Sequence, residues 1–93
     1  MEFLVQIQVN FPPEMAAEEL ASLMGRETAR GRELKEQGTI VRIWRIPGRR
    51  ENVGIWSAAD PDALHAAITS LPVFPWIDAR VTALATHHLE VPS

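Results

Sequence analysis

The sequence predicts an α+β domain whose secondary-structure elements follow the order β-α-β-β-α-β. Three observations lead to this prediction. Four short stretches alternate apolar with polar residues or are rich in β-branched and aromatic ones, and two stretches carry apolar residues at helical spacing. Prolines and glycines fall between these stretches, where turns are expected. The length of 93 residues suits a single domain, and we expect residues 1–93 to form it.

The first half of the chain contains a strand and a long helix. Apolar residues alternate with polar ones from Phe3 onward, so residues 2–11 are predicted to form a strand that Pro12 and Pro13 end. Residues 14–37 are rich in Ala, Glu, Leu and Arg and are predicted to form one helix. Its apolar stripe comprises Leu20, Leu23, Met24, position 27, Gly31 and Leu34, and Gly38 is expected to end it in a left-handed conformation.

The second half contains a hairpin, a shorter helix and a final strand. Asp60 followed by Pro61 is a typical helix start, with an N-cap side chain and a proline in the first turn. The elements are expected as strand 39–47, a turn at Pro47-Gly48, strand 52–57, a helix from Pro61 with Leu64, Ala67, Ile68 and Leu71 buried, an irregular segment 71–75, and strand 76–86.

This order is that of the ferredoxin-like fold, a four-stranded antiparallel sheet with both helices on one face. Strand 39–47 alternates and carries apolar bulk on both faces. One face would then hold Thr39, Val41, Ile43 and Arg45, and the other Ile40, Arg42, Trp44 and Ile46. An exposed apolar face usually marks an assembly surface. We therefore expect a homo-oligomer in which two sheets pair as a dimeric α+β barrel.

Composition excludes several classes of function. The net charge of −3 argues against a nucleic-acid-binding protein. The chain has no cysteine, no apolar run that approaches the ~20 residues of a membrane span and no signal-peptide pattern, so we expect a cytoplasmic protein without membrane contact. No metal-ligand spacing or glycine-rich phosphate loop is present, and neither a metal nor an organic cofactor is expected.

Glu27 is the most informative residue for chemistry. It falls on the apolar stripe of the first helix, three residues after Met24, with Gly31 one turn further on. Burial raises the pKa of a carboxyl group, and such a group can shuttle a proton near neutral pH. Gly31 would leave room for a ligand beside it. The alternative is that Glu27 lies at the margin of the stripe and pairs with Arg26, Arg30 or another arginine.

Four arginines cluster around the predicted hairpin. Arg42 and Arg45 are candidates to anchor an acidic small molecule, because the planar guanidinium matches a carboxylate, and Trp44 shares a face with Arg42. Arg49 and Arg50 are expected to be ordinary surface charges. The histidines, His65, His87 and His88, form no recognisable metal site and are expected to be structural or exposed.

Several runs of residues resemble one known family, the muconolactone Δ-isomerases. The resemblance covers nearly the whole chain at matching spacing. It rests on the opening from Phe3 to Pro12, Gly38-Thr39, Trp44-Arg45-Ile46-Pro47-Gly48, Asn52, Leu64-His65, Leu71-Pro72-Val73-Phe74-Pro75, Asp78, Val81, and Leu84 to His87.

The resemblance implies a small ferredoxin-like enzyme that dimerises through its sheet and assembles further, typically into a decamer. It implies an allylic proton shift that converts muconolactone to 3-oxoadipate enol-lactone in the breakdown of aromatic compounds, without metal or cofactor. Glu27 matches the glutamate on the family's first helix and is the catalytic candidate. The substrate-binding candidates are Arg42, Trp44, Arg45, Asn52 and His65.

Two other functions stay open. Met24, Ile40 and Val53 stand where family members are often more polar or aromatic. The chain could therefore serve a biosynthetic pathway, as an isomerase or cyclase of a larger intermediate. It could also be a ligand-binding module without chemistry, since this fold serves many functions.

Overall fold

Four strands and two helices follow one another in the predicted order, and the fold class is confirmed. The computed structural model describes residues 1–91. Its elements are β1 (Glu2–Val9), α1 (Ala17–Glu36), β2 (Ile40–Arg45), β3 (Glu51–Ser57), α2 (Pro61–Thr69), β4 (Ile77–Leu84) and two short 3₁₀ helices at Phe74–Trp76 and His88–Glu90. The strands form one sheet in the order β2-β3-β1-β4, and all neighbours are antiparallel.

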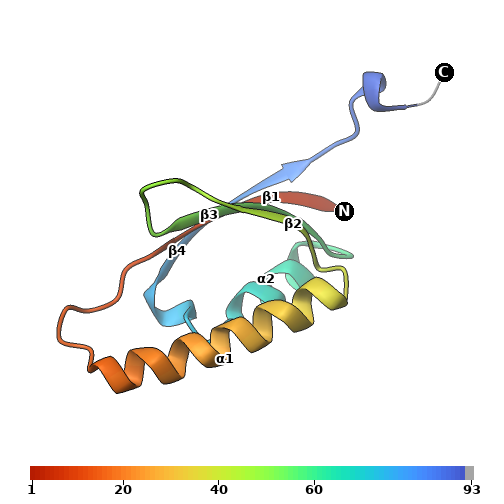
Figure 1. Cartoon of the computed structure of the whole chain (residues 1–93). Helices are drawn as coiled ribbons and strands as arrows, with labels where there is room; N and C mark the ends of the chain where they lie inside the picture. Colours follow the sequence, from red (N-terminus) through yellow and green to blue (C-terminus); the bar gives the residue numbers. More distant parts are fainter. Residues whose placement is uncertain (92–93) are drawn as a thin grey trace.

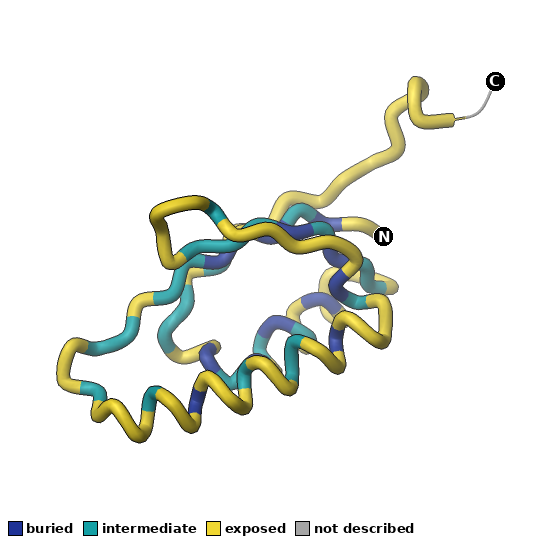
Figure 2. Tube along the Cα trace, in the orientation of Figure 1, coloured by how far each residue is buried: buried dark blue, intermediate teal, exposed yellow. Residues whose placement is uncertain are grey.

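The sheet and the helices form two layers, with the core between them. Both helices lie on the same face of the sheet, and residues 85–91, which follow β4, extend away from this body (Figure 1). Buried residues gather on the inner face, which is the sheet face toward the helices, and on the helix sides opposite it (Figure 2). The core comprises Phe3, Val5, Ile7, Leu23, Leu34, Ile40, Trp56, Leu64, Ile68, Leu71 and Val73.

β1 occupies the middle of the sheet, and its alternation is as predicted. Phe3, Val5 and Ile7 are 2%, 0% and 4% exposed, because they point into the core from a strand paired on both sides. The strand ends at Val9 rather than Phe11. Because Pro12 and Pro13 follow closely, the sheet cannot continue far beyond this point.

α1 begins at Ala17, three residues later than predicted. The N–H of Met15 donates to the carbonyl of Pro12 at 3.1 Å, so a turn precedes the helix. The C-terminus follows the prediction. Gly38 has φ +80°, and its N–H donates to Lys35 O while that of Thr39 donates to Leu34 O. These two bonds satisfy carbonyls at the end of the helix, and a left-handed glycine makes them possible.

The turn of the β2-β3 hairpin is as predicted, but strand β2 is less regular than predicted. The Ile46 carbonyl accepts a hydrogen bond from the N–H of Arg49, with Pro47 between them and Gly48 at φ +77°, as a type II turn requires. Ile40 pairs with Trp56, but Arg42 pairs with Ile55, so a bulge interrupts β2.

The expected alternation of residues 39–46 is therefore wrong. Trp56 and Gly54 are buried and face the helices, so their partners Ile40 and Ile43 lie on the inner face. Arg45, opposite Asn52, follows them. Arg42 and Trp44 lie on the outer face, which is the face away from the helices.

α2 begins as predicted, and the segment after it is more regular than expected. The Asp60 carboxylate accepts a hydrogen bond from the N–H of Ala63 at 2.7 Å, and Pro61 is the first helical residue. After α2, Phe74–Trp76 form a 3₁₀ turn, because the N–H of Trp76 donates to Val73 O. β4 accordingly runs from Ile77 to Leu84, not from 76 to 86.

Candidate functional site

A cavity of about 400 Å³ lies between α1, the turn end of the β2-β3 hairpin, the end of β1 and the segment after α2. Half of its lining residues are apolar: Ile7, Val9, Phe11, Met24, Leu71 and Val73. The others are polar or charged: Glu27, Thr28, Arg45, Arg50, Glu51 and Asn52. An apolar cavity with a few convergent polar groups is the usual form of a small-molecule site.

Glu27 enters this cavity from α1, half-buried between the turns that carry Leu23 and Leu34. Its Oε1 accepts a hydrogen bond from the N–H of Val73 at 3.2 Å. Loss of solvation on burial raises the pKa of the Glu27 carboxyl above its ordinary value of 4.5, and the bond from Val73 lowers it by a smaller amount. The raised pKa suits a group that both accepts and returns a proton.

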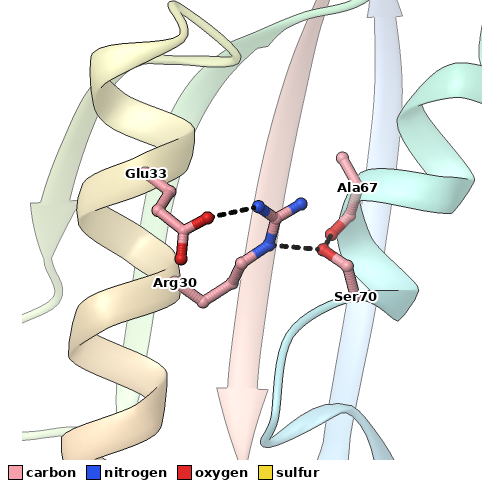
Figure 3. A network of polar contacts seen from close by, with 4 residues as sticks. All are labelled: Arg30, Glu33, Ala67 and Ser70. Carbon is pink, nitrogen blue, oxygen red and sulfur yellow. Dashed lines mark hydrogen bonds and ion pairs between the residues drawn. The ribbon is translucent and has the colours of Figure 1, made fainter.

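Arg30, which could have neutralised Glu27, bonds elsewhere. Its Nε donates to the Ser70 hydroxyl at 2.9 Å and its Nη1 to Glu33 at 3.2 Å, and the Ser70 hydroxyl donates to Ala67 O (Figure 3). Within residues 1–91 Glu27 forms no ion pair, so the alternative of a Glu27–arginine pair is wrong. The Arg30 contacts instead tie α1 to the C-terminal end of α2, close to the segment that supplies the Val73 N–H.

Arg45 and Asn52 meet at the cavity as register partners on β2 and β3. Arg45 forms no ion pair with any residue between 1 and 91. The Asn52 Oδ1 is buried and has no hydrogen-bond partner there. A buried polar atom without a partner is costly, so this amide is poised to bond to a ligand.

The structure separates the other three substrate-binding candidates from the cavity. The Arg42 guanidinium lies 4.9 Å from the centre of the Trp44 ring, as their shared face predicted, but on the outer face of the sheet. His65 is exposed on α2. None of the three lines the cavity that contains Glu27. The β2 bulge explains why Arg42 and Trp44 lie on the outer face, because it decides which arginine of β2 faces the helices.

Sequence reasoning missed Arg50 and Thr28. Arg49 does form a surface ion pair, with its Nε 2.7 Å from the Glu51 carboxylate, whereas Arg50 lines the cavity. Thr28 follows Glu27 but lies off the apolar stripe, so helical periodicity gave no signal for it. Gly31 does not line the cavity, and a Cβ there would meet no atom within 4 Å.

The described part of the chain contains neither a cluster of potential metal ligands nor a helix that could cross a membrane. Residues 1–91 contain no group of three or more His, Cys, Asp or Glu side chains placed to hold a metal ion. His87 and His88 stack on each other, with ring centroids 4.3 Å apart. Over the same residues, neither helix is both long and apolar enough to cross a membrane.

The sequence is similar to one family of enzymes along almost its whole length. Residues 1–90 match the muconolactone delta-isomerase family. Muconolactone Delta-isomerase 2 of Acinetobacter lwoffii is 38% identical over 87 residues, which cover 94% of this chain and 91% of the relative. Muconolactone Delta-isomerase of Cupriavidus pinatubonensis is 33% identical over 94% of this chain and 95% of its own.

The fold is similar to that of a muconolactone isomerase of known structure. The crystal structure of muconolactone isomerase at 3.3 Å resolution superposes with a TM-score of 0.92 at 30% sequence identity. The match covers 100% of this chain and 97% of that one. Sequence and structure therefore agree on the relatives of this chain.

Proposed function

The chain belongs to the muconolactone Δ-isomerase family, and from this we propose that it is a cofactor-independent isomerase that converts muconolactone to 3-oxoadipate enol-lactone. The reaction belongs to the breakdown of aromatic compounds. The observation that carries the proposal is the half-buried Glu27 carboxyl with a raised pKa, in the wall of a cavity that also contains an arginine.

The proposed reaction is an allylic proton shift. Glu27, ionised, removes the proton from the ring carbon that carries the acid arm. The electron pair of that C–H bond forms the new ring double bond, and the old double bond shifts its electrons toward the lactone carbonyl as a dienolate. The Glu27 carboxylic acid then returns the proton to the carbon next to the carbonyl, so no atom is gained or lost. A partly desolvated carboxylate on a rigid helix suits both steps.

Two further groups complete the proposed site. The Arg45 guanidinium binds the carboxylate of the acid arm through its planar fork. The Asn52 amide, whose buried oxygen has no partner within residues 1–91, rotates to present its NH₂ group to the lactone carbonyl oxygen. Donors placed where negative charge develops lower the barrier to enolate formation.

Turnover on (4S)-muconolactone is the direct test. Purified protein should convert it to the enol-lactone without added metal or cofactor, and chelator should leave the rate unchanged. Absorbance would follow the loss of conjugation between the double bond and the carbonyl. A protein that binds the lactone but leaves it unchanged would contradict the proposal and favour a binding module.

Arg45 and Arg42 offer a matched pair, because they are close in sequence and lie on opposite faces of the sheet. Arg45→Gln should raise the KM for muconolactone by about 10–100-fold, the scale of a charge-assisted contact, with a smaller change in kcat. Arg42→Gln, which removes the same charge, should leave KM within about twofold. Steady-state kinetics of both variants would show this. Equal effects would refute the assignment of Arg45 as the anchor.

We also propose a homo-oligomer that forms through the outer face of the sheet. The helices leave this face uncovered, and it carries Trp44 at 44% and Leu84 at 40% exposure, with Val53 and Ile55 half-buried between them. Light scattering should show at least a dimer, and Trp44→Glu should dissociate it. A stable monomer at micromolar concentration would contradict this. Decamer formation and a cytoplasmic location stay predictions.

A further inference from the structure

The cavity is larger than the proposed substrate needs. Its volume of about 400 Å³ falls in the range of sites that hold drug-sized ligands, roughly 300–1,000 Å³. Muconolactone is a five-membered ring with a short acid arm, which is far smaller than such ligands. The surplus space lies in the same cavity as Glu27, so a larger substrate could reach the base.

A second hollow adjoins this cavity. It has a volume of about 380 Å³, and we call it the outer hollow. It shares Val9, Phe11, Arg50 and Glu51 with the first cavity, so the two spaces meet at these residues. Its other lining residues, Gln8, Asn10, Gly48 and Arg49, are mostly polar. A ligand that extends from the cavity into the outer hollow would pass from apolar to polar surroundings.

Arg50 lies at this junction, and no carboxylate of residues 1–91 forms an ion pair with it. Within residues 1–91 the Glu51 carboxylate is paired with Arg49 at 2.7 Å, whereas Arg50 has neither an ion pair nor a side-chain hydrogen bond. The junction therefore carries a net positive charge. Arg45, which also has no ion pair within residues 1–91, supplies a second positive charge to the same cavity.

The backbone of Arg50 is held in place, which makes it suitable as an anchor. Its carbonyl accepts a hydrogen bond from the N–H of Val9 at 2.9 Å. The turn before it is closed by the bond between Arg49 and Ile46, and the N–H of Ile46 donates to the carbonyl of Glu51 at 3.0 Å. Only the side chain of Arg50 is left to adapt to a ligand.

We propose that Arg50 and the outer hollow form a second anion subsite, and that the preferred substrate is an unsaturated lactone with two carboxylates. Arg45 binds the carboxylate nearer the ring, and Arg50 binds the other at the mouth of the outer hollow. This specificity rests on the proposed isomerase function, because it assumes that the lactone ring lies against Glu27.

Two saturated lactones, which cannot be isomerised, test the subsite by calorimetry. One is γ-butyrolactone with an acetate arm, a monoanion, and the other is γ-butyrolactone with a succinate arm, a dianion. The unaltered protein should bind the succinate-arm lactone about tenfold more tightly or better, the scale of one charge-assisted hydrogen bond. Arg50→Gln should remove this preference and leave the affinity for the acetate-arm lactone within about twofold.

Arg32→Gln is the control, because Arg32 is exposed on α1 and lines neither space. It removes the same charge and should keep the preference for the dianion. Equal affinity of the unaltered protein for the two lactones would overturn the proposal, and so would a loss of the preference in Arg32→Gln. Because binding is measured without turnover, failure of the isomerase function would appear separately, as absent conversion of unsaturated lactone.

Discussion

Glu27→Gln should reduce kcat on muconolactone by about 10²–10⁴-fold, the usual contribution of a positioned acid–base group. Glutamine has the same shape, and its side-chain oxygen can still accept the hydrogen bond from the N–H of Val73 that Glu27 accepts at 3.2 Å. It cannot take up a proton, so both halves of the shift lose their carrier. The fold and the oligomer should be unchanged by circular dichroism and light scattering.

Glu18→Gln is a suitable control, because Glu18 is exposed in the first turn of the same helix. It makes the same substitution without touching the cavity and should keep near-native turnover. If Glu27→Gln retained the native rate on a substrate that the protein turns over, Glu27 would not be the base.

The pH profile follows from the direction of the pKa shift. Glu27 must be ionised to remove the first proton, so kcat/KM should fall as pH drops through the pKa of this carboxyl in the free enzyme. Because burial raises that pKa, the midpoint of the acid limb should lie above 4.5, the ordinary value of a glutamate. A midpoint at or below 4.5 would contradict the environment that the structure shows.

Gly54→Ala should destabilise the fold by roughly 1–3 kcal/mol, the usual cost of overpacking. A Cβ at this position would lie 2.6 Å from the carbonyl oxygen of Arg42 and 3.4 Å from the Cα of Ile43. The nearest atom belongs to the backbone of the paired strand, so it cannot turn aside as a side chain would. Relief requires β2 to move, and β2 carries Arg45 to the cavity. Urea unfolding at fixed protein concentration would measure the loss.

Gly31→Ala is the same substitution, but it should stabilise the fold instead of destabilising it. A Cβ there would meet nothing within 4 Å, and the position lies inside α1. Alanine is favoured over glycine in a helix by about 0.5–1 kcal/mol, so the free energy of unfolding should rise by that amount. Activity should be kept, because Gly31 does not line the cavity. If both variants lost stability equally, the close strand approach at Gly54 would not be the cause.

The sequence by itself determined the features that depend on local backbone geometry. The period of a strand places Phe3, Val5 and Ile7 on one face, and the structure buries all three. Gly38 and Asp60 end and begin helices as their side chains predict. Glu27 follows the same logic, because helical spacing alone puts it beside buried residues.

Only the tertiary structure decided what surrounds Glu27. The N–H of Val73, 46 residues away along the chain, reaches its carboxylate because the segment after α2 packs against α1. Of the three candidates expected on β2, Arg45 lines the cavity and Arg42 and Trp44 do not, because one bulge in β2 reverses the face of every residue beyond it.

Arg50 became a cavity residue through the pairing of its carbonyl with β1 and through the turn before it. Its neighbour Arg49 has the same side chain, yet it pairs with Glu51 instead. Composition and periodicity cannot distinguish these two arginines. Periodicity depends on a few adjacent residues, whereas register, bulges and loop packing depend on pairings between distant parts of the chain, and those pairings decide which charges meet at the cavity.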